Sequence, residues 1–261
     1  MSDFTIKPVG DCALCAEFAE EISIAVNSRV HALDALVRKA AIPGVVETVP
    51  TYRTLIIHYR PEVISWEALR ERVLALHAGS GAVVETAGTV VELPVLYGGK
   101  VALEPGAPHY DGWDGRETAP DLGDVLAHEG ISREELIRRH SANDCYVYFQ
   151  AFAIGHSYVG SPEKSFTVPR RKTPRTLVPQ GSVAVWADQT VLYGFDLPCG
   201  WQVIGRTPVL LYDERRAQPS YCSSGQWIRF VPIGAGEYAR IRALALAGRY
   251  EPVIRKKEAG A

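Results

Sequence analysis

The stretch from residue 178 to residue 212 constrains the fold more than any other part of the chain, because frequent glycine and proline break up short apolar alternations. Apolar side chains alternate at Val183, Val185, Val191 and Tyr193, which is the pattern of short β-strands. The interruptions fall at Gly181, Gly194, Pro198, Gly200, Gly205 and Pro208. Turns and close backbone approach need such residues, so the stretch predicts a turn-rich β-domain that contains a binding site.

A Pro-Cys-Gly turn in this stretch is followed by Trp201 and Gln202. The pair presents a large flat ring and a neutral hydrogen-bonding side chain beside flexible backbone. Such a pair can stack on a planar amide and hydrogen-bond its carbonyl or nitrogen. The alternative is that Trp201 belongs to the ordinary core of a β-domain.

The segment PRRKTPR, residues 169–175, carries cations at Arg170, Arg171, Lys172 and Arg175. Its prolines prevent helix formation and keep the segment extended. Because a guanidinium group matches the geometry of phosphate and carboxylate, we interpret the segment as an anion clamp. A solvated basic loop is the alternative interpretation.

Several segments, taken in order, resemble the family of KipI and the 5-oxoprolinase B subunits, which is also called allophanate hydrolase subunit 1. They read GDCALCAEF, VPTYRTLIIHY, PRRKTPRTLVPQGSV and PCGWQVIGRTP. The resemblance extends from Gly10 to about Pro232 and includes ELPVLYGG and PDLGDVLAHEGIS.

This resemblance implies an N-terminal α+β domain followed by a cyclophilin-like β-barrel domain. Bacterial members typically pair with a homologous C-like subunit, and many pairs belong to ATP-dependent 5-oxoprolinase together with a LamB/YcsF-type subunit. A similar module forms the carboxyltransferase domain of urea carboxylase. KipI itself is named as an inhibitor of a sporulation histidine kinase.

Two departures from the family pattern fall on the expected pocket. The family loop Gly-Phe-x-Pro-Gly-Phe-x-Tyr-Leu-Gly corresponds to residues 151–160, where Ile154 and His156 replace the proline and the second aromatic. Cys199 stands in the usual Pro-Gly-Gly-Trp-Gln turn. Because a cysteine restricts positive φ and adds volume, we expect it to alter the turn and the ligand space.

Periodicity predicts the order ββαββα for the first domain. We expect strands within 4–18, a helix around 26–37, paired strands at 45–49 and 55–59, and a helix capped by Ser65. This order suits a small open sheet covered by helices. The domain boundary is placed in the small, flexible segment 79–88, which gives domains 1–86 and 87–261.

The second domain is expected to open with a strand at 90–96 and a long loop over 98–120. A short helix should then begin at Pro120 and Asp121, and a second should begin at Ser132, which forms a capping box with Glu135. Further strands are predicted at 146–152 and 227–232, with a helix over 237–246. The tail, RKKEAGA, is expected to fray.

Composition excludes several functional classes. The formal net charge of −2 gives no excess of positive charge of the kind that nucleic-acid binding needs. No apolar run is long enough to span a bilayer and the polar start lacks an export signal, so we expect a cytoplasmic protein without membrane contact. The five cysteines are expected to be reduced thiols. Cys12 and Cys15 lack further ligands at suitable spacing, so no metal site is expected.

Hydrolysis of a lactam or a urea-type amide is difficult because resonance weakens the carbonyl as an electrophile. Coupling to ATP would phosphorylate the carbonyl oxygen and so create a leaving group. We expect Arg170, Arg175 and Arg206 to supply positive charge for that step. Since no GxxxxGK[ST] loop is present, ATP should be handled together with partner subunits.

In the predicted pocket, Gln202 orients the amide while Trp201 and Tyr158 form the walls. Imidazole titrates near neutral pH, so two histidines are expected to transfer protons. For His140, at a predicted helix end, interaction with the helix dipole is the alternative. The expected catalytic residues are His140, His156 and Arg175, and the expected substrate-binding residues are Tyr158, Arg170, Trp201, Gln202 and Arg206.

The leading hypothesis is a B-like component of an ATP-dependent 5-oxoprolinase or a related cyclic-amide or urea-type amidohydrolase. It would form a composite active site with the C-like subunit and would have no activity alone. The alternatives are a KipI-like inhibitor of a sensor histidine kinase and a relative specialised for another small metabolite.

Overall fold

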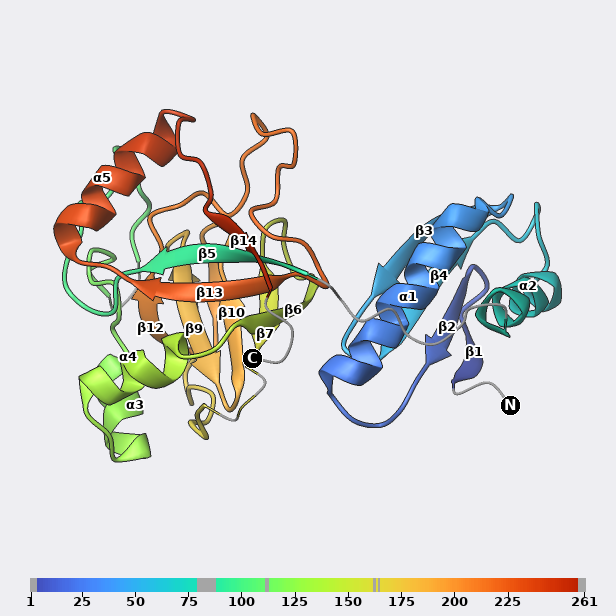
Figure 1. Cartoon of the computed structure of the whole chain (residues 1–261), viewed down its shortest axis with the longest axis horizontal. Coiled ribbons are helices and arrows are strands. Elements are labelled where there is room, and N and C mark those ends of the chain that lie inside the picture. Colours follow the sequence, from blue (N-terminus) through green and yellow to red (C-terminus); the bar gives the residue numbers. More distant parts are fainter. Residues whose placement is uncertain (1–3, 79–87, 111–112, 162, 164, 258–261) are drawn as a thin grey trace. The chain divides into compact units, whose positions relative to one another are not determined.

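The computed structural model describes residues 4–78, 88–110, 113–161, 163 and 165–257. The chain divides into two compact units, Met1–Ala87 and Gly88–Ala261 (Figure 1). Most of the predicted boundary segment, residues 79–87, lies outside the described residues.

The first unit has the predicted order ββαββα. Its elements are β1 (Thr5–Val9), β2 (Ala13–Glu17), α1 (Ile24–Ala40), β3 (Val45–Pro50), β4 (Thr54–Tyr59) and α2 (Trp66–Ala78). The strands form an antiparallel sheet in the order β1-β2-β4-β3, and α1 lies across one face of it (Figure 1). The prediction of an open sheet covered by helices is confirmed for this unit.

Side-chain caps start both helices of the first unit. The Ser23 hydroxyl accepts a hydrogen bond from the Val26 amide, and the Ser65 hydroxyl accepts one from Ala68 at 3.3 Å. Apolar residues then recur at helical spacing along α1 and pack against alternate residues of the sheet. The core they form includes Leu14, Val26, Val30, Leu33, Val37, Leu55 and Ile57.

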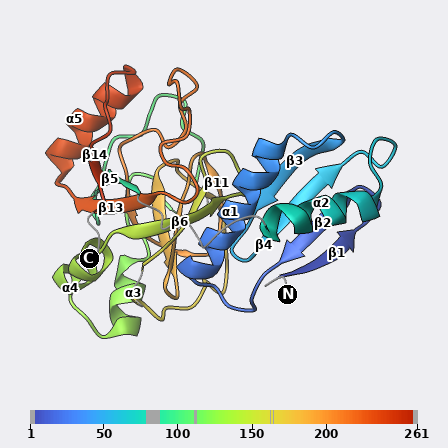
Figure 2. The same ribbon diagram turned by 45° about the vertical axis from the view of Figure 1, so that its right-hand side comes forward.

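The second unit is built around one large sheet. Its elements are β5 (Thr89–Val95), α3 (Leu122–Glu129), α4 (Arg133–Ser141), β6 (Cys145–Gln150), β7 (Ser157–Gly160), β8 (Arg175–Val178), β9 (Ser182–Trp186), β10 (Gln189–Leu192), β11 (Leu197–Cys199), β12 (Gln202–Arg206), β13 (Trp227–Pro232), α5 (Ala235–Leu246) and β14 (Ile254–Lys256). The large sheet has the order β12-β9-β10-β7-β6-β13-β5-β14, and β11 pairs separately with β8. Figure 2 shows β13 between β5 and β6.

The predicted barrel is not what forms, because the large sheet is open. Strand β14 pairs with β5 along Thr89–Val91 and so occupies an edge that a closed barrel would need. Within the described chain, β12 meets the opposite end of the sheet only through a bridge between Leu96 and Arg206. The predicted frayed tail is therefore wrong for residues 255 and 256, which belong to β14.

The described helices include none that is long and apolar enough to cross a membrane. The long segment between β5 and α3 is anchored by Trp113, whose indole is buried beside β8 and β9. The Trp113 indole belongs to a separate cluster of apolar side chains, distinct from the main core of the large sheet. This cluster consists of Trp113, Val178, Ala184, Val191, Tyr193, Cys199, Trp201 and Val203, and it supports the site described below.

Candidate functional site

A small cavity brings together four of the residues that the sequence marks. Its volume is about 150 Å³. It is lined by Phe152, His156, Tyr158, Arg170, Val191, Tyr193, Pro198, Gly200 and Trp201. We call this cavity the aromatic pocket. Strands β7 and β10, the turn between β11 and β12, and the loop between β6 and β7 supply most of its wall.

Ring contacts hold the walls of the aromatic pocket. Trp201 meets Trp186 edge to face, with ring centroids 5.4 Å apart, and meets Tyr158 in the same way at 6.1 Å. Tyr158 also stacks on Phe149 at 4.6 Å. Because each ring is fixed by another, the pocket presents preformed flat surfaces to a ligand.

The loop between β6 and β7 depends on glycine at two close approaches. Gly155 has φ +70°, and a side chain there would meet the Cβ of Tyr212 at 2.9 Å. A side chain at Gly194 would meet the Ile154 carbonyl oxygen at 2.4 Å. Bare backbone at both positions therefore lets the loop lie against the segment that follows β10 and against Leu211 and Tyr212, with His156 in the pocket wall.

Arg170 supplies the positive charge of the aromatic pocket. Its guanidinium lies 5.4 Å from the centroid of Trp186, and one guanidinium nitrogen would be 3.5 Å from a Cβ at Gly200. In the part of the chain that the structure describes, Arg171 and Arg175 pair with Asp121, whereas Arg170 makes no ion pair. Arg170 is thus an uncompensated cation at the pocket wall.

His156 is only 2% exposed and lies among aromatic rings. Its ring centroid is 4.7 Å from Tyr193, 5.2 Å from Tyr158 and 5.4 Å from Phe152. Burial lowers the pKa of His156 to about 4, so the imidazole is neutral at neutral pH. The proton-transfer role of His156 stays a prediction.

Gln202 lies outside the aromatic pocket, contrary to the expectation that it faces the same ligand as Trp201. It lines a neighbouring hollow of about 330 Å³ together with Asp124, Pro169, Arg170, Arg171, Lys172 and Thr173, which we call the basic hollow. Its amide donates to the Pro169 carbonyl at 3.0 Å. Successive residues of an extended segment point to opposite sides, which explains the separation.

Arg175 is held by a buried carboxylate and does not line the aromatic pocket. Asp121, 1% exposed, accepts two hydrogen bonds from Arg175 at 2.7 and 2.8 Å and one from the Val203 amide at 2.7 Å. It also pairs with Arg171. The Arg175 guanidinium lies 5.4 Å from the Trp113 ring centroid. Asp121 therefore ties the segment before α3 to β8 through Arg175 and to β12 through the Val203 amide.

Arg206 also makes structural contacts in place of the expected ligand contact. Its guanidinium donates to the Gln180 carbonyl at 3.0 Å and to the Gly115 carbonyl at 3.1 Å. These bonds fix two connecting segments against β12. Tertiary packing decides whether a charged side chain on a strand is buried or faces a ligand. The position of Arg206 in the sequence therefore could not show which of these applies.

His140 is buried in the core, away from the aromatic pocket. Its Nδ1 lies 2.6 Å from the Tyr97 hydroxyl and its Nε2 lies 3.0 Å from the Thr190 hydroxyl. Its ring stacks on Phe230 at 4.2 Å. Burial lowers the pKa of His140 to about 3. A neutral ring has no charge to offer the helix dipole. The proton-transfer role of His140 stays a prediction.

Cys199 packs behind the pocket. Its φ is not among the positive values that the structure contains, and its thiol donates to the Trp201 carbonyl at 3.3 Å within the apolar cluster around Trp113. The expected effect on the ligand space is therefore absent from the pocket lining. All five cysteines are unpaired, and the described residues hold no cluster of three or more side chains arranged to bind a metal.

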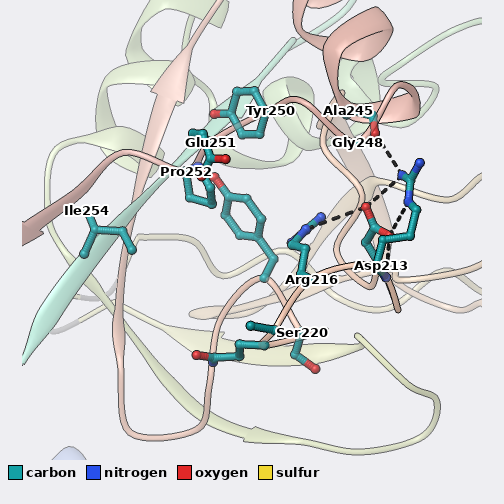
Figure 3. A pocket seen from close by; sticks show the side chains of 13 residues that line it. Asp213, Arg216, Ser220, Ala245, Gly248, Tyr250, Glu251, Pro252 and Ile254 are labelled. Carbon is teal, nitrogen blue, oxygen red and sulfur yellow. Dashed lines mark hydrogen bonds and ion pairs between the residues drawn. The ribbon is translucent and has the colours of Figure 1, made fainter.

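A larger cavity of about 360 Å³ lies between the segment after β12 and the segment that follows α5 (Figure 3). Asp213 pairs there with Arg215 at 2.7 Å and with Arg216 at 3.8 Å. Arg215 also donates to the Leu246 carbonyl at 3.0 Å. Because both arginines that line this cavity pair with Asp213, the cavity lacks the open cation that distinguishes the aromatic pocket.

Comparison with known proteins identifies relatives over most of the chain. The family described as carboxyltransferase domain, subdomain C and D, matches residues 4–222. The 5-oxoprolinase B subunit of Bacillus subtilis (strain 168) is 31% identical over 245 residues, which cover 90% of this chain and 95% of that protein. The protein of the same name from Escherichia coli O157:H7 is 33% identical over 229 residues, or 87% of this chain and 95% of that protein.

Solved structures with a similar fold belong to longer chains. The crystal structure of TTHA0988 in space group P212121 matches with a TM-score of 0.70 and 28% identity over 85% of this chain and 40% of its own. The Kluyveromyces lactis urea carboxylase has a TM-score of 0.73 and 17% identity, over 97% of this chain and 24% of that one. The latter likeness shows the fold alone. This chain spans less than half the length of both solved chains.

Proposed function

Because the chain belongs to the family described as carboxyltransferase domain, subdomain C and D, we propose that it is one subunit of an ATP-dependent amidohydrolase. The curated relatives reported above are 5-oxoprolinase B subunits. The substrate of the proposed amidohydrolase is a small cyclic amide of the 5-oxoproline type. A homologous C-like subunit completes the site, and a LamB/YcsF-type subunit joins the complex. The isolated chain is inactive.

The observation that carries this proposal is the combination of flat walls with one open guanidinium. The ring of 5-oxoproline can lie against Trp201 and Tyr158, while its carboxylate pairs with Arg170. Pockets for drug-sized ligands measure about 300 Å³ or more. At about 150 Å³, the aromatic pocket suits a single five-membered ring.

A whole nucleotide fits this chain less well. ATP supplies the phosphoryl group that activates an amide, and it needs several donors or cations around its phosphates. In the basic hollow, Asp121 already neutralises Arg171, so Arg170 and Lys172 are the cations left open among the described residues. They match one anionic group, and we therefore assign nucleotide binding to the partner subunits.

The exposed apolar residues of the loop between β6 and β7 support a protein contact at the pocket. Phe152 is 65% exposed and Ile154 is 59% exposed. We propose that the C-like subunit covers them and thereby excludes water from the amide. A KipI-like inhibitor of a histidine kinase would also use exposed surface, but Arg170→Gln would then leave kinase inhibition intact.

Reconstitution tests the proposed function. The chain is combined with a C-like subunit and a LamB/YcsF-type subunit, and phosphate release is measured with and without 5-oxoproline. We expect 5-oxoproline-dependent ATP hydrolysis that requires every subunit. Arg170→Gln should lower kcat/KM roughly tenfold or more, the value of a charge-assisted hydrogen bond. The exposed Arg138→Gln is the matched control. Absence of turnover across lactams and ureas contradicts the proposal.

A further inference from the structure

His156 is a buried polar residue that lines a cavity without an internal partner. In the described chain, neither ring nitrogen of His156 has a hydrogen-bond partner, and Nδ1 is wholly shielded from solvent. Buried polar side-chain atoms nearly always have a partner. Since the rest of the ring is held by Tyr193, Tyr158 and Phe152, its open hydrogen-bonding capacity marks a place for a ligand.

The surroundings of His156 determine which nitrogen carries the proton. Burial lowers the pKa of His156 to about 4, so at pH 7 the ring has one N–H donor and one lone pair. A buried N–H without an acceptor is rarer than a buried acceptor without a donor. The shielded and unpartnered Nδ1 therefore holds the lone pair, and Nε2 carries the hydrogen.

We infer that the Nε2–H of His156 donates a hydrogen bond to an uncharged carbonyl oxygen of the ligand in the aromatic pocket. This makes His156 a specificity-determining residue for ligands that combine such an oxygen with one anionic group, which Arg170 binds. The choice of a cyclic amide as that ligand rests on the proposed function.

A neutral donor suits a substrate better than a hydrolysed product. The ring carbonyl of a lactam accepts a hydrogen bond without burying charge. Hydrolysis of the ring C–N bond creates a second carboxylate and an ammonium group, and Arg170 already pairs with the first carboxylate. Taking both new charged groups out of water among Tyr158, Tyr193 and Trp201 is costly, whereas the cyclic amide brings neither. His156 thus favours the cyclic form over the open-chain acid.

Binding to the isolated full-length chain tests this inference. The probes are 3-oxocyclopentanecarboxylate, which keeps the ring carbonyl of 5-oxoproline, and cyclopentanecarboxylate, which lacks it. We expect the wild-type chain to bind the ketone roughly tenfold more tightly, as one buried hydrogen bond allows. His156→Phe should lose the preference, and His156→Gln, whose amide can donate, should recover most of it. His128→Phe, at an exposed position in α3, is the matched control.

Nitrogen-15 NMR of histidine-labelled wild-type chain gives a second readout. We expect the Nε2–H form of His156 at pH 7, with a shift at Nε2 when the ketone is added. The Nδ1–H form, equal binding of the two probes, or binding of neither overturns the inference. If His156→Phe fails to fold, the wild-type spectrum and His156→Gln decide. A ketone preference without turnover by the reconstituted complex would reject the proposed function alone.

Discussion

Trp201 and Gln202 are consecutive, yet their side chains lie in different hollows that share the Arg170 side chain. Trp201 lines the aromatic pocket, while Gln202 lines the basic hollow and donates to the Pro169 carbonyl at 3.0 Å. Arg170 lines both. A ligand held by Trp201 and Arg170 in the aromatic pocket is therefore separated from Gln202, whose role is to hold the basic segment in place.

Substitutions at these two positions should have different effects. Trp201→Leu removes a stacking wall and should weaken 5-oxoproline binding roughly tenfold, since such ring contacts contribute about 1 kcal/mol or more beyond burial. Gln202→Leu should leave binding within about twofold while costing about 1 kcal/mol of stability through the lost hydrogen bond. Calorimetric titration and urea unfolding measure the two effects. Equal loss of binding in both variants would contradict the separation.

Asp121→Asn should destabilise the second unit strongly. It removes the buried charge that pairs with Arg171 and Arg175, and breaking a buried ion pair typically costs about 3 to 5 kcal/mol. Arg175→Gln should be destabilising for the same reason. Chemical denaturation measures both, with Arg138→Gln as the exposed control. A stable Arg175→Gln chain that has lost only catalytic activity would restore Arg175 as a catalytic candidate.

Acid should destabilise the fold through His140. Its folded-state pKa of about 3 lies below the ordinary value of 6.5, so the unfolded chain binds the proton first as pH falls. The contribution of neutral His140 to the free energy of unfolding is complete above about pH 7 and is lost progressively as pH falls from 6.5 towards 3. One such group costs about 2.5 kcal/mol at pH 4.5. Denaturation between pH 7.5 and 4.5 should show a shallower pH dependence for His140→Gln than for wild type, and an unchanged slope would contradict this reading.

Gly194→Ala should displace the loop that carries His156. The new methyl group would meet the Ile154 carbonyl oxygen at 2.4 Å, and overpacking of this kind costs about 1 to 3 kcal/mol. Gly123→Ala in α3 is the control, because a side chain there meets no atom within 4 Å and alanine favours helix. Thermal unfolding should move in opposite directions for the two variants. A Gly194→Ala chain that unfolds at the wild-type temperature would show that the loop does not pack against the segment that follows β10.

The element order was predictable because it rests on local patterns. The apolar spacing of Val26, Val30 and Val37 lies within a single helix, and the Ser65 cap lies beside the residues it binds. Asp121 shows where this reasoning stops. The sequence predicts the start of a helix here, but it does not predict that the Asp121 side chain, which makes no capping bond, pairs with arginines 50 and 54 residues away.

The same limit explains the other differences between sequence and structure. The short apolar tail around Ile254 becomes a strand only because β5 offers it an edge. The residues that line the aromatic pocket beside the predicted ones, such as Val191 and Tyr193, carry an ordinary strand pattern. Only the pairing of β10 with β7 places them next to Tyr158.

The most direct test of the central claim is NMR of the tryptophan indole N–H groups during titration with 5-oxoproline, on the isolated chain and in the reconstituted complex. The account predicts shifts for Trp201 and its neighbour Trp186, with Trp66 and Trp227 unchanged and with the response abolished by Arg170→Gln. Saturating 5-oxoproline that leaves Trp201 unchanged, or that instead perturbs the residues around Asp213 and Tyr221, would contradict it.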